Sequence, residues 1–226
     1  MLTHLDETET IDVAKRGRPA AGQDPAKRSQ IIAGARRVFI EMGFDAASMN
    51  DITRAAGVSK GTIYVYFASK EELFEALIEE ERCAIFNDLY DVFEHGKGVR
   101  DTLVQFGTAL ATKITSETVM RAQRSVIGIC ERIPELGARF YESGPKRGHA
   151  KIVSFLKRAV DDGHLAIPDV DAAAYQLTEL CMAGLFRQRL FGYRPDAPRA
   201  DEIKTVVNAG VDVFLSAYSR RPAATN

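Results

Sequence analysis

Apolar residues recur at helical spacing through most of this 226-residue sequence, with breaks at segments that contain glycine or proline. Ile31, Ala35 and Val38 form one such stripe, and Leu103 and Phe106 begin another. The pattern predicts an all-α fold. Outside the stretch 48–67, the predicted helices cover residues 25–42, 70–94, 99–115, 115–132, 135–142, 146–162, 171–191 and 198–218.

The stretch from Ser48 to Lys70 carries the signals of two short helices joined by a tight turn, followed by a new helix start. Ser48 with Asp51 three residues later is a capping box, in which each residue satisfies a backbone N–H at the start of the helix. Ser59 is a second helix cap, and Gly57 is typical of the left-handed residue that ends a helix. This arrangement predicts a helix-turn-helix.

The second helix of this pair has a polar outer face that suits the major groove of DNA. Short donors lie near its start and phenolic hydroxyls follow, where they can reach phosphates. The alternative is a pair of ordinary core helices. The residues of the outer face are Lys60, Gly61, Thr62, Tyr64 and Tyr66.

These residues also carry a family resemblance. The segments 57–67 (GVSKGTIYVYF) and 69–73 (SKEEL) resemble the DNA-binding signature of TetR-type transcriptional regulators. The resemblance implies an all-helical homodimer with an N-terminal three-helix DNA-binding domain. It also implies a larger C-terminal domain for ligand binding and dimerisation.

The same resemblance implies roles for individual residues. Thr62 and Tyr64 fall where the family contacts bases or backbone, and Tyr66 and Lys70 fall where it binds phosphate. We expect the DNA-binding residues to be Arg16, Arg18, Lys27, Ser48, Ser59, Lys60, Gly61, Thr62, Tyr64, Tyr66 and Lys70.

The charge distribution agrees with a localised DNA-binding region. Residues 15–70 contain ten Lys/Arg and four Asp/Glu, a balance of +6, so the rest of a chain of net charge −1 sums to −7. Within the basic segment 15–19 (KRGRP), Arg16 and Arg18 are expected to enter a narrow minor groove. The alternative is a solvated tail with loose phosphate contacts.

The domain organisation follows from these motifs. The segment 131–145 resembles part of the AefR-like C-terminal domain of one TetR branch, whose members are often associated with efflux or stress genes. The helix predicted at 70–94 would link the two domains. We expect a flexible basic arm at 1–23, the helix-turn-helix domain at 24–70, the regulatory domain at 71–220 and a tail at 221–226.

Aromatic residues gather where the helices of the C-terminal domain are expected to converge. Mostly apolar spaces between helices are common small-molecule sites, although a simple hydrophobic core is the alternative for each residue. Together with the family resemblance, these aromatic residues favour a small hydrophobic or aromatic effector. Tyr90, Gln123 or Arg124 would bind its polar groups. The predicted pocket comprises Phe86, Tyr90, Phe93, Phe106, Gln123, Phe140, Tyr141 and Phe155.

The last two predicted helices, 171–191 and 198–218, have an apolar surface broader than one neighbour needs. Two such helices and their symmetry mates would form a four-helix interface, whereas the alternative is that they close the core of the monomer. The predicted interface residues are Gly184, Val207, Val211 and Phe214.

Other chemistry is not indicated. The sequence has no G-x-G-x-x-G, P-loop or H-E-x-x-H motif, and its four histidines and three cysteines lack ligand spacing. We therefore expect no catalytic residue, metal or cofactor. The first fourteen residues do not form a signal peptide and no stretch suits a membrane span, which predicts a cytoplasmic protein with no membrane partner.

These features together predict a ligand-responsive transcriptional repressor. A homodimer would bind an inverted repeat in double-stranded DNA and release it when a lipophilic or aromatic effector binds, with efflux or detoxification genes as the candidate targets. The alternatives are a regulator without a small-molecule inducer, an activator, or a helical enzyme or carrier in which the helix-turn-helix is a lookalike.

Overall fold

The computed structural model describes residues 22–86, 88–96 and 98–220, apart from the side chains of residues 84 and 85. Most of the predicted arm, including Arg16 and Arg18, and the whole tail 221–226 lie outside the described residues. Predictions about these segments therefore stay predictions.

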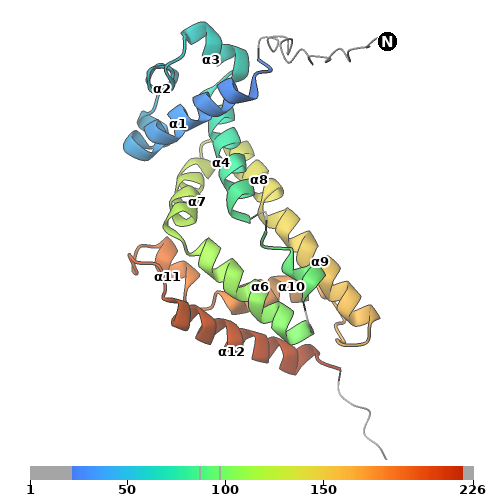
Figure 1. Ribbon diagram of the computed structural model, residues 1–226. Coiled ribbons are helices and arrows are strands. Elements are labelled where there is room, and N and C mark those ends of the chain that lie inside the picture. The colour runs from blue at the N-terminus through green and yellow to red at the C-terminus, as the bar shows by residue number, and fades with distance from the viewer. Residues whose placement is uncertain (1–21, 87, 97, 221–226) are drawn as a thin grey trace, which may run out of the picture. The chain divides into compact units, whose positions relative to one another are not determined.

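Every regular element in the described part of the chain is a helix (Figure 1). The all-α prediction is confirmed. The helices are α1 (Pro25–Ala46), α2 (Met49–Ala56), α3 (Lys60–Tyr66), α4 (Lys70–Phe86), α5 (Val92–His95), α6 (Val99–Ile114), α7 (Glu117–Cys130), α8 (Pro134–Ser143), α9 (Pro145–Asp161), α10 (Val170–Cys181), α11 (Phe186–Leu190) and α12 (Ala200–Tyr218).

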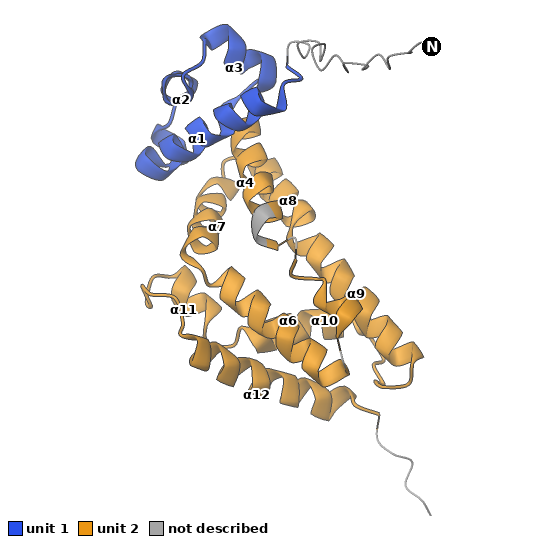
Figure 2. Cartoon of the chain, viewed as in Figure 1, with its two compact units in different colours: residues 1–70 blue, residues 71–226 orange. Residues whose placement is uncertain are grey.

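The chain divides into two compact units, residues 1–70 and 71–226 (Figure 2). Unit 1 contains α1, α2 and α3 around a small core. Ile31, Ile52 and Ile63, one from each helix, are completely buried there. Gly34 allows α1 and α2 to pack closely, because a Cβ at this position would lie 2.6 Å from the Ala56 Cβ.

Unit 2 is built around a core contributed mainly by α6, α9, α10 and α12. Phe106, Leu156, Leu177 and Val207 come from these four helices and are all inaccessible to solvent. Burial of this apolar surface is the main stabilising contribution to the unit. Helix α12 packs against both α6 and α10.

The helix predicted at 70–94 was wrong as one continuous helix, because α4 ends at Phe86 and a separate short helix, α5, begins at Val92. Between these two helices the chain continues through turns whose hydrogen bonds span three residues, such as Leu89 N–H to Phe86 O at 3.1 Å. Asp88 and Asp91 in this segment have low helix propensity. Leu89 and Phe93 are buried in the unit 2 core, so packing holds the segment in its turns.

The helix predicted at 171–191 was also wrong, because it is two helices. Helix α10 ends at Cys181, and Gly184 adopts a left-handed backbone with φ +73° before α11 begins at Phe186. Glycine takes this conformation without the steric cost that a Cβ would impose. The remaining predicted helices agree with the structure to within a few residues at each end.

Candidate DNA-binding surface and ligand cavity

The first helix of the helix-turn-helix begins with the predicted capping box. The Ser48 hydroxyl accepts the Asp51 N–H at 3.2 Å, and the Asp51 carboxylate accepts the Ser48 N–H, also at 3.2 Å. The hydrogen bond from the Ser48 hydroxyl lowers the pKa of the Asp51 carboxyl. The Asp51 carboxylate is therefore negatively charged at neutral pH, in the first turn of α2 at the positive end of the helix dipole.

The turn and the start of α3 also follow local chemistry. Gly57 ends α2 in the left-handed region, with φ 63° and ψ 38°. The Ser59 hydroxyl then accepts the Thr62 N–H at 3.0 Å and lies 2.7 Å from the Thr62 hydroxyl. The predicted DNA residues Ser48 and Ser59 are thus both helix caps in the structure.

Helix α3 presents one face to solvent and one to the core of unit 1. Ile63 is completely buried, whereas Lys60, Gly61, Tyr64 and Val65 are exposed. Sequence reasoning missed Val65, which is 53% exposed and lies one turn after Gly61. An exposed apolar side chain on this face suits contact with a thymine methyl group.

Two residues expected to approach the DNA backbone, Tyr66 and Lys27, also have partners within unit 1. The Tyr66 hydroxyl accepts the Asp24 N–H at 3.3 Å, which leaves its own proton to donate. The Lys27 ammonium donates to the Gln30 side chain at 2.8 Å and keeps two further protons.

Lys70 has a different role from the one expected. Its ammonium donates to the carbonyls of Phe44, Asp45 and Ala47 at 2.9, 3.3 and 3.0 Å, and lies 4.6 Å from the centre of the Phe44 ring. An ammonium has three protons, so these carbonyls occupy all of its donors. In this structure Lys70 stabilises the end of α1, and its ammonium has no free proton to donate to a phosphate.

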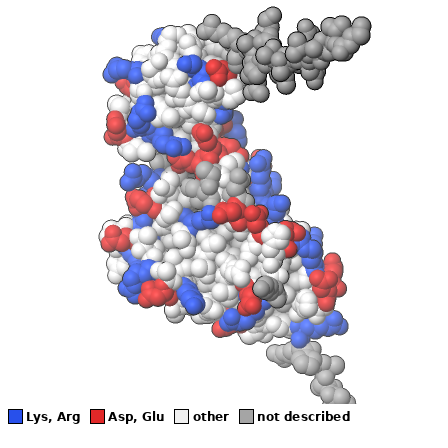
Figure 3. Space-filling model, in the orientation of Figure 1, with Lys and Arg blue, Asp and Glu red and all other residues white. Residues whose placement is uncertain are grey.

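Arginine side chains add positive charge to unit 1. The Arg54 side chain is 81% exposed, and the Arg28 guanidinium lies over the Phe67 ring at 5.3 Å. The visible face of unit 2 shows both signs of charge interspersed (Figure 3).

A cavity of about 760 Å³ lies within unit 2. Seven of the eight predicted pocket residues line it, but Phe155 does not. Phe155 is buried and stacks on the Phe93 ring at 4.7 Å, so it supports the aromatic wall from behind. The predicted residues that line the cavity are Phe86, Tyr90, Phe93, Phe106, Gln123, Phe140 and Tyr141.

The polar groups of the cavity lie among aromatic rings. Tyr90 packs against Phe93 and Phe106 at ring distances of 6.2 and 6.1 Å. Burial raises the pKa of the Tyr90 phenol, so it stays protonated at neutral pH. Gly148 leaves room for this hydroxyl, because a Cβ there would lie 2.1 Å from the Tyr90 oxygen.

A cluster of polar side chains from α8, α9 and α10 lies at the cavity. The Tyr141 and Tyr175 hydroxyls lie 3.2 Å apart, and the His149 ring stacks on Tyr175 at 3.8 Å. His149 Nε2 lies 2.9 Å from the Asp171 carboxylate. Tyr175 and His149 were not among the predicted pocket residues, because their sequence positions give no sign that α9 and α10 meet there.

Arg124 is not a polar anchor of the cavity. Its guanidinium donates to the backbone carbonyls of Leu190, at 2.9 Å, and Arg189. Gln123, in contrast, does line the cavity.

The predicted dimer residues on α12 lie inside the fold. Val207 and Val211 are completely buried and Phe214 is 1% exposed, all within the core of unit 2. These three side chains therefore close the core of unit 2, whereas the part that the last helices play in a dimer stays a prediction. Gly184, the fourth predicted residue, is exposed in the turn after α10 and has no neighbour within 4 Å of where a Cβ would lie.

The first unit defines the class of protein. Its capped α2, left-handed glycine turn and exposed α3 face form a helix-turn-helix, and such proteins place the second helix in the major groove. The second unit adds a cavity of the size that small molecules occupy.

The chain belongs to the TetR family of transcriptional regulators. Residues 31–77 match the family model described as "Bacterial regulatory proteins, tetR family", and residues 101–220 match "AefR-like transcriptional repressor, C-terminal domain". The predicted resemblances to both are confirmed. Members of this family regulate transcription and are not enzymes.

Individual proteins show how far the similarity extends. The chain is 42% identical over 150 residues to the HTH-type transcriptional regulator UidR of Escherichia coli K12, covering 65% of this chain and 72% of UidR. Its match to the repressor Rv1474c of Mycobacterium tuberculosis, 45% identical over 56 residues, spans only 25% of this chain and 30% of that protein.

Among solved structures, the "Flavonoid-responsive Regulator FrrA" is 32% identical with a TM-score of 0.78, covering 88% of this chain and all of FrrA. None of the helices described in residues 22–220 combines the length and apolar character needed to cross a bilayer.

Proposed function

We propose that this protein is a ligand-released repressor that binds an inverted-repeat operator as a homodimer. The cavity in unit 2 carries the proposal, because about 760 Å³ lined by aromatic rings and a few polar groups suits a planar aromatic compound. The effector must bind the DNA-incompetent state more tightly than the competent one, since equal affinity shifts no population.

The effector class we propose is planar phenols of the flavonoid type. FrrA, which is 32% identical along its whole length, is described as flavonoid-responsive. In this chain, the rings of Tyr90, Phe93 and Phe106 would stack on such a compound, while the Tyr90 phenol and the Gln123 amide would bind its hydroxyl or carbonyl groups. Control of efflux or detoxification genes would fit compounds of this class.

The dimer we propose uses the outer faces of the last helices in place of the buried residues Val207, Val211 and Phe214. Val213 is 55% exposed, and Ala209 and Ser216 next to it on α12 are exposed and small. Small side chains permit close helix packing, and TetR-family regulators dimerise. Light scattering of the wild-type protein should therefore give the mass of two chains.

Two substitutions test the DNA-binding surface. One replaces the exposed Tyr64, and the other replaces Lys70, whose ammonium is hydrogen-bonded within unit 1. Tyr64→Ala should lower operator affinity about 5- to 150-fold without changing stability, since a good base-edge contact contributes about 1–3 kcal/mol. Lys70→Met should instead lower the melting temperature, because three carbonyls lose their donor. Fluorescence anisotropy on the operator and thermal denaturation give the two values. If the Lys70→Met protein has normal stability but binds DNA more weakly, Lys70 contacts phosphate and does not stabilise the end of α1.

The effector site is tested by release of a labelled operator in the presence of a panel of flavonoids. Tyr90→Phe should raise the concentration of the active compound needed for release by roughly 2- to 12-fold, the effect of losing one hydrogen bond. Tyr193→Phe is the matched control, because Tyr193 is 83% exposed and does not line the cavity. Equal responses of both variants, or no release by any compound in the panel, would contradict the proposed effector site.

A further inference from the structure

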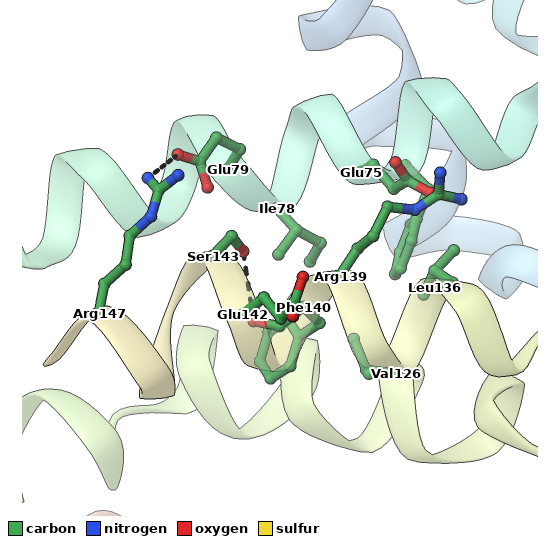
Figure 4. Close-up of a pocket in the computed structure, with 11 residues that line it drawn as sticks. Glu75, Ile78, Glu79, Val126, Leu136, Arg139, Phe140, Glu142, Ser143 and Arg147 are labelled. Carbon is green, nitrogen blue, oxygen red and sulfur yellow. Dashed lines mark hydrogen bonds and ion pairs between the residues drawn. The ribbon is translucent and has the colours of Figure 1, made fainter. Parts of the chain in front are cut away.

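A second, smaller hollow of about 340 Å³ lies along α4, between this helix and helices α7 and α8 (Figure 4). Its floor is apolar, and its volume is near the lower end of the range for small-molecule sites. Ile78 and Phe140 lie near the middle of the hollow, with ion pairs at its two ends. The apolar lining residues are Phe74, Ile78, Val126, Leu136 and Phe140.

The charged groups around this hollow are unequally paired. At one end, Arg139 Nη2 lies 2.6 Å from the Glu75 carboxylate. At the other end, the Glu79 carboxylate accepts hydrogen bonds from Arg82 at 2.9 and 2.5 Å. These bonds are the main reason why the pKa of Glu79 is lowered, so Glu79 remains a carboxylate held by Arg82.

Arg147 is the weakly paired cation at the hollow. Its guanidinium comes no closer than 3.9 Å to Glu79, which is beyond hydrogen-bond distance, and its side chain is 69% exposed. Within the described part of the chain, the Arg147 guanidinium has no hydrogen bond. A planar guanidinium with free donors is suited to bind a carboxylate through two parallel hydrogen bonds.

We propose that this hollow is a second ligand site that binds a small aromatic carboxylate. The ring system would lie on the apolar floor at Ile78 and Phe140, and the carboxylate would bind Arg147. The volume allows a compound of about two fused rings, well below the size that fills the larger cavity.

A ligand in the hollow could influence the larger cavity, because the two share lining residues. Ile78, Phe140 and Arg147 line both the hollow and the larger cavity, so a ligand in one changes a wall of the other. Glu79 and three further lining residues belong to α4, which begins at Lys70, the last residue of unit 1. A bound carboxylate would also compete with Glu79 for Arg147.

The test uses 1-naphthoate as the probe and 1-naphthamide as its neutral counterpart, titrated calorimetrically into the full chain without DNA. The wild type should bind the carboxylate about two- to fivefold more tightly than the amide, the effect expected of an ion pair to a largely exposed arginine. Arg147→Gln should remove this difference. Because no DNA is present, the result does not depend on operator release.

Two filling variants distinguish the hollow from the larger cavity. Ser143 lines only the hollow and Ala122 lines only the cavity. Ser143→Phe should weaken naphthoate binding at least tenfold, whereas Ala122→Phe should leave it unchanged, with circular dichroism confirming that both variants fold. The reverse pattern, equal affinity for naphthoate and naphthamide, or no binding to the wild type would overturn the proposal.

Discussion

Replacing Arg189 by alanine is expected to lower the free energy of unfolding by roughly 2–4 kcal/mol, because buried carbonyls lose their donor and the removed side chain leaves a cavity. Arg189 is 1% exposed, although arginine is rarely buried unless it is paired. It holds α11 and the following turn to the connection between α6 and α7. Its loss should therefore loosen this whole corner of unit 2.

The contacts of Arg189 explain the size of this effect. Nε donates to the Thr115 carbonyl at 3.1 Å, and Nη1 donates to the Arg194 carbonyl at 3.1 Å and to the Pro195 carbonyl. Nη2 donates to the Glu117 carboxylate at 2.9 Å. Alanine would leave three carbonyls without this donor and would also create a cavity.

Urea denaturation followed by circular dichroism measures the change, with Arg199→Ala as the control. Arg199 also pairs with a carboxylate, that of Asp201 at 3.0 Å, but its side chain is 76% exposed, so its loss should have little effect. Similar losses of stability in the two variants would contradict the role assigned to Arg189.

This prediction also has a pH dependence. The hydrogen bond from Arg189, followed by that from Arg121, lowers the pKa of the Glu117 carboxyl in the folded state. A lowered carboxyl pKa gives stability that is present above the unfolded-state pKa and is lost as the pH falls through the folded-state value. The difference between wild type and Arg189→Ala should therefore narrow at acidic pH.

Gly34→Ala is expected to destabilise unit 1 by about 1–3 kcal/mol and to weaken DNA binding in proportion. The added Cβ would lie 2.6–2.7 Å from the Cβ, Cα and backbone N of Ala56. These atoms belong to the backbone and first side-chain carbon of α2, so the clash cannot be relieved by rotating a side chain. Helix α2 must move away from α1, and α3 is joined to α2 by a short turn.

The matched control is Gly128→Ala in the last turn of α7. A Cβ at Gly128 has no neighbour within 4 Å, and alanine favours a helix over glycine by about 0.5–1 kcal/mol. The two substitutions are chemically identical and should change the free energy of unfolding in opposite directions. Thermal denaturation and operator binding by fluorescence anisotropy check both. A stable, DNA-binding Gly34→Ala protein would show that α1 and α2 tolerate a wider spacing.

The comparison between sequence and structure separates local from distant determinants. The capping box at Ser48, the cap at Ser59 and the left-handed Gly57 were predictable because each depends on hydrogen bonds or steric limits within a few residues. The family signature over the same residues allowed the function class to be inferred before any tertiary contact was known.

The pocket was predictable in part. Phe86, Tyr90 and Phe93 come from consecutive turns of the chain, and aromatic side chains at these positions suggested a common site. Phe155 shares their chemistry but lies behind Phe93, whereas His149 and Tyr175 face the cavity. Sequence periodicity shows that a residue is on the apolar side of its helix, but not which neighbouring helix or space that side meets.

The sequence by itself determined the helical class, the helix starts and the DNA-binding motif, because these depend on side chains and backbone groups close together along the chain. Only the tertiary structure decided that Phe214 lies in the core of unit 2, and that Lys70 donates to carbonyls at the end of α1. It also showed that Gly34 sets the α1–α2 spacing. These properties depend on contacts between segments that are far apart in the sequence. Such contacts, and the burial and hydrogen bonds that they bring, form only when the chain folds.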